Sequence, residues 1–207
     1  MQIFTFLKHL ALVSVVVAQD WSGSVIKGGK KRKILCGGFF VADNWFLTDS
    51  SCLLDETRNM IRNRGVNISR VVRTERTDDA ILVKTEFPEA PETVVLASQE
   101  FPYESEGQTV QFSYRRGGKP RVKKWELRLC PDGICIGEGN SGGKCKHRRG
   151  FPVEVENDEK PTVMGFIKGG GCISKKSVFY LTPVRGLRDW VESVTGETLE
   201  ESPQLCN

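Results

Sequence analysis

The stretch that indicates the fold occupies residues 137–145 and runs Gly137-Glu138-Gly139-Asn140-Ser141-Gly142-Gly143-Lys144-Cys145. Glycine permits the positive φ angles that other residues avoid, so glycines on both sides of one serine predict a tight turn. Such a turn can present the hydroxyl of Ser141 as a nucleophile and direct backbone N–H groups to one point as an oxyanion hole. A glycine-rich loop with an incidental serine is the other interpretation of this stretch alone.

Two further stretches extend the pattern. The first runs Cys36-Gly37-Gly38-Phe39-Phe40-Val41-Ala42-Asp43-Asn44-Trp45-Phe46-Leu47-Thr48-Asp49-Ser50-Ser51-Cys52. The second consists of Gly169-Gly170-Gly171-Cys172, followed by Thr182-Pro183-Val184 and Asp189-Trp190-Val191. Together with residues 137–145, these stretches resemble three segments of the chymotrypsin-like serine proteases. The family segments are the G-D-S-G-G turn, C-G-G-S-L-I-x-x-x-W-V-L-T-A-A-H-C, and the closing G-x-G-C, T-R-V and D-W-I. The resemblance extends over residues 21–194.

The resemblance implies an all-β fold of two six-stranded antiparallel β-barrels with shortened loops and a C-terminal helix. We expect the trypsin-like domain at residues 19–195 and an acidic tail at 196–207. Its parts are a first barrel at about 21–87, a linker at 88–102, a second barrel at about 103–185 and a helix at 186–195. Within the linker, Val94, Val95 and Leu96 are expected to dock as one strand.

The resemblance also assigns the three catalytic positions. Ser51 stands where the family has its histidine, and Ser141 matches the nucleophile. Asp78 matches the catalytic aspartate, and Asp79 is the alternative partner in a shifted register. A serine hydroxyl does not replace an imidazole as proton acceptor at neutral pH. Loss of one essential triad member costs on the order of a million-fold in turnover in a comparable hydrolase.

The activation switch of the family is also missing from the sequence. Active members release an isoleucine terminus whose ammonium pairs with the aspartate beside the nucleophile. This sequence has no Arg/Lys-Ile-Val-Gly-Gly segment, and Asn140 replaces that aspartate. The two losses are coupled, because a buried carboxylate without its cation would cost several kcal/mol. Gly139, Asn140 and Ser141 therefore form a former oxyanion turn whose amides need not converge.

The remaining residues near the expected cleft offer no obvious substitute base or pocket. His147 follows Ser141 by six residues on an expected strand, and a rise of about 3.3 Å per residue carries it away. Lys168 stands near the tryptophan of the family's pocket wall, and Phe179 near a glycine that keeps the pocket open. We therefore expect a plugged or absent pocket. No spacing typical of metal ligands is present, and no cofactor is expected.

The cysteines and one sequon predict covalent features. The resemblance implies a disulfide between Cys36 and Cys52. Our further choices are Cys135–Cys172 and Cys130–Cys145, which leave Cys206 over, although spacing does not settle these pairs. Asn67-Ile68-Ser69 is a sequon for N-glycosylation, provided that the protein is secreted.

Residues 1–18 predict a signal peptide. A weakly basic start with Lys8 and His9 precedes an apolar run and a small-residue cleavage site ending at Ala18. The run is shorter than a membrane span needs. All 7 cysteines follow this segment, which favours an oxidising compartment. We expect an extracellular protein with no membrane span and no nucleic-acid partner.

The formal net charge is +4, and basic residues cluster. Solvated faces are one interpretation, and a surface for glycosaminoglycan-like polyanions is the other. The candidate binding residues are Lys30, Lys31, Arg32, Lys33, Lys146, Arg148 and Arg149.

The expected function follows from the degenerate triad. The sequence is similar to inactive serine protease homologues that invertebrates secrete into body or reproductive fluids. Such a protein would act by binding, as a cofactor for an active protease or as a decoy for protease inhibitors such as serpins. Two other hypotheses are a residual serine-type endopeptidase, which uses Ser141 with a borrowed base, and a polyanion-binding module.

Overall fold

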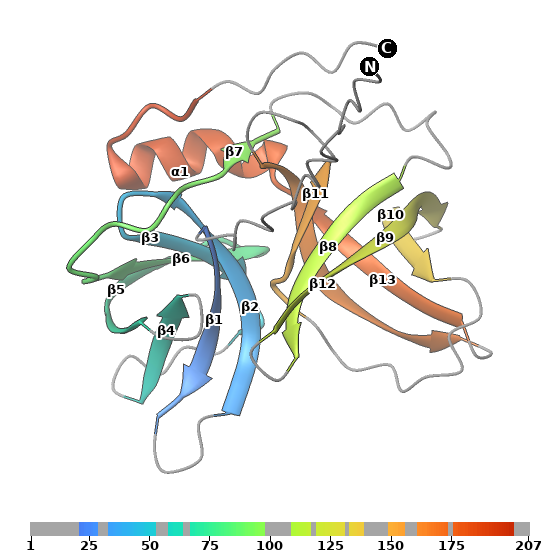
Figure 1. Ribbon diagram of the computed structural model, residues 1–207. Helices are drawn as coiled ribbons and strands as arrows, with labels where there is room; N and C mark the ends of the chain where they lie inside the picture. The colour runs from blue at the N-terminus through green and yellow to red at the C-terminus, as the bar shows by residue number, and fades with distance from the viewer. Residues whose placement is uncertain are drawn as a thin grey trace, which may run out of the picture.

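The computed structural model describes residues 21–28, 33–52, 58–63, 67–97, 109–116, 119–130, 133–138, 149–155, 161–173 and 176–200. Within these ranges the chain forms the strands β1 to β13, a short 3-10 helix and one α-helix (Figure 1). The expected nucleophile turn at 139–143 lies outside the described residues, as do most of the basic residues proposed to bind polyanions.

The first six strands form a closed antiparallel barrel in the order β1-β2-β3-β6-β5-β4. Their bounds are β1 (Ser22–Lys27), β2 (Lys33–Ala42), β3 (Trp45–Asp49), β4 (Asn59–Asn63), β5 (Asn67–Arg76) and β6 (Ala80–Thr85). In Figure 1 this barrel is the blue-to-green body on the left. The expected first barrel is thereby confirmed, and full closure removes the unpaired strand edges that would invite aggregation.

Strand β2 contributes to two cores because successive side chains of a strand point to opposite faces. Phe40 faces the barrel interior, where its ring centroid lies 5.2 Å from that of Phe46 and 5.7 Å from that of Phe87. Phe39 faces the second sheet, with its centroid 6.3 Å from that of Phe166. Phe39 and Phe40 are both fully buried. Strand β2 therefore contributes one of these side chains to the barrel interior and the other to the core between the sheets.

The second sheet has seven strands in the order β11-β8-β9-β10-β13-β12-β7. These are β7 (Val95–Leu96), β8 (Thr109–Arg116), β9 (Lys119–Cys130), β10 (Gly133–Glu138), β11 (Pro152–Val155), β12 (Thr162–Ile173) and β13 (Lys176–Pro183). Strand β7 comes from the expected linker and pairs in parallel with β12, which confirms that this segment docks as a strand. A second closed six-stranded barrel stays a prediction.

The C-terminal helix is confirmed. A 3-10 turn, η1 (Arg185–Leu187), leads into α1 (Arg188–Thr195), whose Val191 is fully buried. The helix ends at Gly196, which adopts φ 73° and donates its N–H to Glu192 O. Glycine at this left-handed position is a common helix terminator. Among the described residues, no helix has the length and apolarity that crossing a membrane requires.

One of the three predicted disulfides is confirmed, and the other two are wrong. Cys36 and Cys52 are bonded, with their Cα atoms 6.2 Å apart. The predicted pairs Cys135–Cys172 and Cys130–Cys145 are wrong, because Cys130 is bonded to Cys135. The physical reason is local: β9 and β10 form a tight hairpin in which Cys130 pairs with Gly133, so the two cysteine Cα atoms lie 5.9 Å apart. Matching each cysteine to a distant family partner overlooked this hairpin.

Candidate functional site

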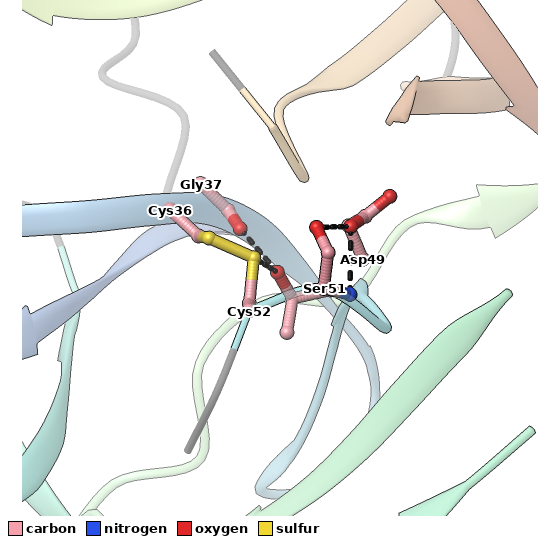
Figure 2. Close-up of a disulfide and its surroundings, with 6 residues drawn as sticks. Cys36, Gly37, Asp49, Ser51 and Cys52 are labelled. Atoms are coloured by element: carbon pink, nitrogen blue, oxygen red, sulfur yellow. Dashed lines mark hydrogen bonds between the residues drawn. A yellow bond between two sulfur atoms is a disulfide. The ribbon is translucent and has the colours of Figure 1, made fainter. Parts of the chain in front are cut away.

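The turn that follows β3 holds Ser51, which the sequence resemblance aligns with the histidine of the chymotrypsin-like proteases. The disulfide fixes one end of this turn at Cys52, whose N–H also donates to Asp49 O at 2.9 Å. Thr48 anchors the other end, because its Oγ1 donates to Gly37 O at 2.6 Å. Figure 2 shows Ser51 between Cys52 and Asp49. Ser51 is exposed, so the turn presents a hydroxyl at the surface.

The hydroxyl of Ser51 is hydrogen-bonded to the buried carboxylate of Asp49. Ser51 Oγ donates a hydrogen bond to Oδ1 of Asp49, and the N–H of Ser51 donates to the same oxygen at 2.9 Å. The Asp49 side chain is only 1% exposed. Its second oxygen points away from Ser51 (Figure 2) and has no hydrogen-bond partner among the described residues. The sequence analysis did not identify Asp49. The available indication was an aspartate at the end of a mostly apolar strand, β3.

The loop that enters β6 holds Asp78 and Asp79, the two aspartates that the sequence resemblance offers for the triad. Thr77 Oγ1 accepts from the N–H groups of Asp79, at 3.3 Å, and Ala80, at 3.0 Å. Ser50 ties this loop to the Ser51 turn, because its N–H donates to Asp79 O at 3.0 Å and its Oγ to Asp78 O at 2.6 Å. Asp78 therefore contributes its main-chain carbonyl to this site, and its side chain is exposed. The carboxylate that faces the second sheet is that of Asp79.

Asp79 is paired with Lys168 of β12. The Nζ of Lys168 lies 2.7 Å from Oδ1 of Asp79. Lys168 falls at an irregularity in the pairing of β12 with β13, where Ile167 pairs with Leu181 and Gly169 with Tyr180. A β-bulge of this kind redirects a side chain and often occurs beside functional sites. Here the bulge carries the residue that reaches from the second sheet to the first barrel.

The charge state of Lys168 follows from its surroundings. The hydrogen bond that Lys168 donates to Asp79 raises the pKa of Lys168 above its ordinary value. Slight burial opposes the rise, and the charges of Asp79 and Asp49 add to it. A general base must be unprotonated to accept a proton, so its pKa has to lie near the working pH or below it. Because the raised pKa keeps the ammonium protonated at neutral pH, Lys168 is unsuited to act as a general base.

The two sheets also meet through main-chain contacts just after the expected nucleophile turn. Gly37 N–H of β2 donates to Arg149 O at 2.9 Å, and the neighbouring Gly150 is held to its own sheet, because its N–H donates to Ile167 O of β12 at 2.7 Å. Gly150 adopts φ 76°, and a Cβ there would lie 2.3 Å from Gly37 O. A Cβ on Gly37 would lie 2.4 Å from the ring of Phe151. This close backbone contact requires glycine at both positions.

The structure thus brings some of the expected site residues together and leaves others elsewhere. Ser51 and Asp79 lie at the junction of the two sheets, joined through Ser50. Lys33 and Arg149 are both exposed, the former on β2 and the latter at the sheet junction, and Asn67 is exposed at the start of β5. The other predicted residues lie outside the described residues, namely Gly139, Asn140, Ser141, Lys30, Lys31, Arg32, Lys146 and Arg148.

No protein-family model matches this chain, and no curated protein matches it. The closed six-stranded antiparallel barrel is consistent with a trypsin-like fold.

Proposed function

We propose that this chain is a catalytically inactive, secreted homologue of the chymotrypsin-like serine proteases, and that it acts by binding other secreted proteins. The observation that carries the proposal is the hydrogen bond from Ser51 Oγ to the buried carboxylate of Asp49. At the position of the family's base, this chain has a hydroxyl that donates its proton rather than a ring nitrogen that accepts one. A serine nucleophile without such an acceptor is not activated.

Two further observations support inactivity. Asp79, one of the two candidates for the triad aspartate, is paired with Lys168 rather than with a base. The raised pKa of Lys168 keeps the amine protonated, which argues against the hypothesis of a residual endopeptidase that borrows a lysine as its base. Inactivity leaves binding as the function, either as a cofactor for an active protease or as a decoy for inhibitors such as serpins.

The fold offers independent support for the family. Besides the closed first barrel, β11 pairs with both β8 and β12. Counting this additional pairing, each strand among β8 to β13 has a neighbour on both sides, as the strands of a second barrel would. The disulfides Cys36–Cys52 and Cys130–Cys135 support the expectation that the chain matures in an oxidising compartment.

A fluorophosphonate probe tests the proposal directly. The purified secreted protein and its Ser141→Ala variant are incubated with the probe, with an active trypsin-like protease as the positive control. We expect no labelling of either form. Stoichiometric labelling that disappears in Ser141→Ala would establish the residual endopeptidase instead. Formation of a stable complex with an active protease or with a serpin, measured by size-exclusion chromatography, then separates the cofactor role from the decoy role.

A further inference from the structure

The outer surface of the first barrel carries a mixed apolar and cationic patch on β4 and β5. Alternate residues of a strand point to opposite sides, and Ile61 of β4 and Val71 of β5 belong to the core inside the barrel. The residues that alternate with these two therefore face outwards. They are Met60 and Arg62 of β4 and Ile68, Arg70 and Val72 of β5, here called the β4–β5 face. In Figure 1 both strands lie on the side of the barrel away from the second sheet.

The strand register brings these five residues together. Arg70 lies opposite Met60, and Arg62 lies opposite Ile68. Arg62 and Arg70 are thus diagonal neighbours, at a typical separation of about 7–8 Å. Val72 is the second residue after Arg70, and the rise of a strand places it about 7 Å further along. The five side chains therefore form one continuous surface on two neighbouring strands.

The β4–β5 face is open to solvent. Arg70 and Val72 are exposed, with 47% of Val72 accessible, and the other three residues are half-buried. Within the described part of the chain, neither arginine of the face takes part in an ion pair. The single acidic residue of these two strands, Glu75, is bound by Arg73, whose Nη2 lies 2.7 Å from Glu75 Oε1. The arginines of the face therefore have no carboxylate partner on β4 or β5.

We propose that the β4–β5 face binds an acidic segment of another secreted protein, one in which carboxylates alternate with aliphatic side chains. This inference rests on the proposed function, because it names the surface by which the chain would bind its partner. Both cations of the face are arginines, whose planar guanidinium groups pair bidentately with carboxylates. Aliphatic side chains of the partner would cover Val72, Met60 and Ile68 and remove their apolar surface from water.

The composition of the face favours a protein partner over other polyanions. Protein interfaces are enriched in arginine and methionine and depleted in lysine and glutamate, and the face follows this pattern. A sulfated glycan would pair with the arginines but would leave the three apolar side chains uncovered. The closed barrel offers no strand edge to which a partner could add a strand. Recognition must therefore use the side chains of the face.

The probe is a fluorescein-labelled peptide that alternates glutamate and leucine, and its dissociation constant for the secreted full chain is measured by fluorescence anisotropy. Arg62→Gln/Arg70→Gln should weaken binding by about tenfold or more, because each change removes a charge-assisted contact. Arg62→Lys/Arg70→Lys keeps the charge and loses the bidentate geometry, so it should weaken binding by a smaller factor. Val72→Ser should weaken binding about threefold, because it removes apolar contact area.

The charge-matched control is Lys27→Gln/Arg76→Gln. Both residues are exposed, and they pair with Asn59 and Ile81, on the side of the sheet that faces the barrel interior. We expect this control to change binding less than about twofold at physiological salt, because charges away from the face are screened. Melting temperatures verify that all variants fold.

Four outcomes would overturn this inference. The first is no binding of the glutamate–leucine peptide, and the second is equal weakening in the control variant. The third is equal affinity for a peptide that alternates glutamate and serine, because charge alone would then account for binding. The fourth is binding of heparin at lower concentrations than the peptide, lost in Arg62→Gln/Arg70→Gln, which would assign the face to a sulfated glycan.

The inference and the proposed function fail separately. None of the four outcomes alters labelling by fluorophosphonate. A stable complex with a protease or serpin that persists in Arg62→Gln/Arg70→Gln would leave the proposed function intact and would place its binding surface outside the β4–β5 face.

Discussion

Lys168 and Asp79 form an ion pair that joins the second sheet to the loop before β6 of the first barrel, with Nζ 2.7 Å from Oδ1. The pair lies beside the Ser51 turn, to which Asp79 is also bonded through its carbonyl. Its side chains are 56% and 48% exposed. The pair therefore bridges the two sheets at the surface, beside the turn that holds Ser51.

The first prediction concerns the strength of this pair. In a double-mutant cycle of Lys168→Met and Asp79→Asn, we expect a coupling free energy of unfolding below about 1 kcal/mol, because water screens exposed ion pairs. Since the folded-state pKa of Lys168 is raised, its contribution is fully present below the ordinary lysine pKa and lost as the pH rises through the raised value. Coupling measured by urea denaturation should thus be the same at about pH 7 and about pH 9. A loss of coupling between these pH values would contradict the assigned charge state.

A second prediction concerns restoration of the histidine. We expect Ser51→His to hydrolyse a fluorogenic arginyl peptide no faster than the unmodified protein, because Asp79 remains paired with Lys168 and cannot orient an imidazole. The triple change Ser51→His/Lys168→Gly/Asn140→Asp should behave the same if the activation terminus is required. Hydrolysis by Ser51→His alone would mean that only the base is missing and that the rest of the site is intact. Ser51→Ala is the matched control.

A third prediction concerns the glycines at the sheet junction. Gly37→Ala and Gly150→Ala should each lower the free energy of unfolding by about 1–3 kcal/mol, the usual cost of overpacking. The added Cβ atoms would lie 2.4 Å from the Phe151 ring and 2.3 Å from Gly37 O, respectively. Gly186→Ala is the control, because nothing lies within 4 Å of its Cβ position; we expect a change within about 0.5 kcal/mol. Equal urea midpoints for all three variants would refute the tight contact.

A fourth prediction compares the two disulfides. Replacing Cys36 and Cys52 by serine should destabilise the fold by about 3 kcal/mol, and replacing Cys130 and Cys135 by about 2 kcal/mol, from the chain-entropy estimate for each closed loop. The sequence separations are 16 and 5 residues. Thermal denaturation of the two double variants gives the order, and peptide mapping of the unreduced protein tests the Cys130–Cys135 bond. A map that links Cys135 to Cys172 would overturn the observed pairing.

Parts of the fold were predictable where the pattern of apolar residues and the positions of cysteine or glycine indicated the same element. Residues 39–47 form a mostly apolar run that predicts a buried strand and turn, and the family resemblance implies the bridge between Cys36 and Cys52, so β2, β3 and their disulfide were expected. The helix that ends at Gly196 followed from apolar residues at helical spacing. The Cys130–Cys135 pair did not, because a motif match looks for distant partners, whereas a hairpin brings near neighbours together.

The candidate site was predictable only in part. Ser51 was located by its position before Cys52, but its acceptor Asp49 was not, because burial of a carboxylate depends on how the turn folds back over the strand end. Asp79 and Lys168 are 89 residues apart, and only the bulge in β12 and the closure of the barrel bring them together. The placement of Asp78 and Asp79 was left open by the sequence, and the paired carboxylate is that of Asp79.

Phe39 and Phe40 face two different cores, and this constrains how the sequence of β2 can evolve. A single inserted or deleted residue within β2 would exchange which ring enters the barrel and which faces the neighbouring sheet, and both compartments would then be filled by the wrong shapes. A change of one residue in the length of β2 is therefore expected to cost more stability than a single substitution in it. Indels in descendants of this gene should accordingly accumulate in the hairpin ends and spare the stretch around these two rings.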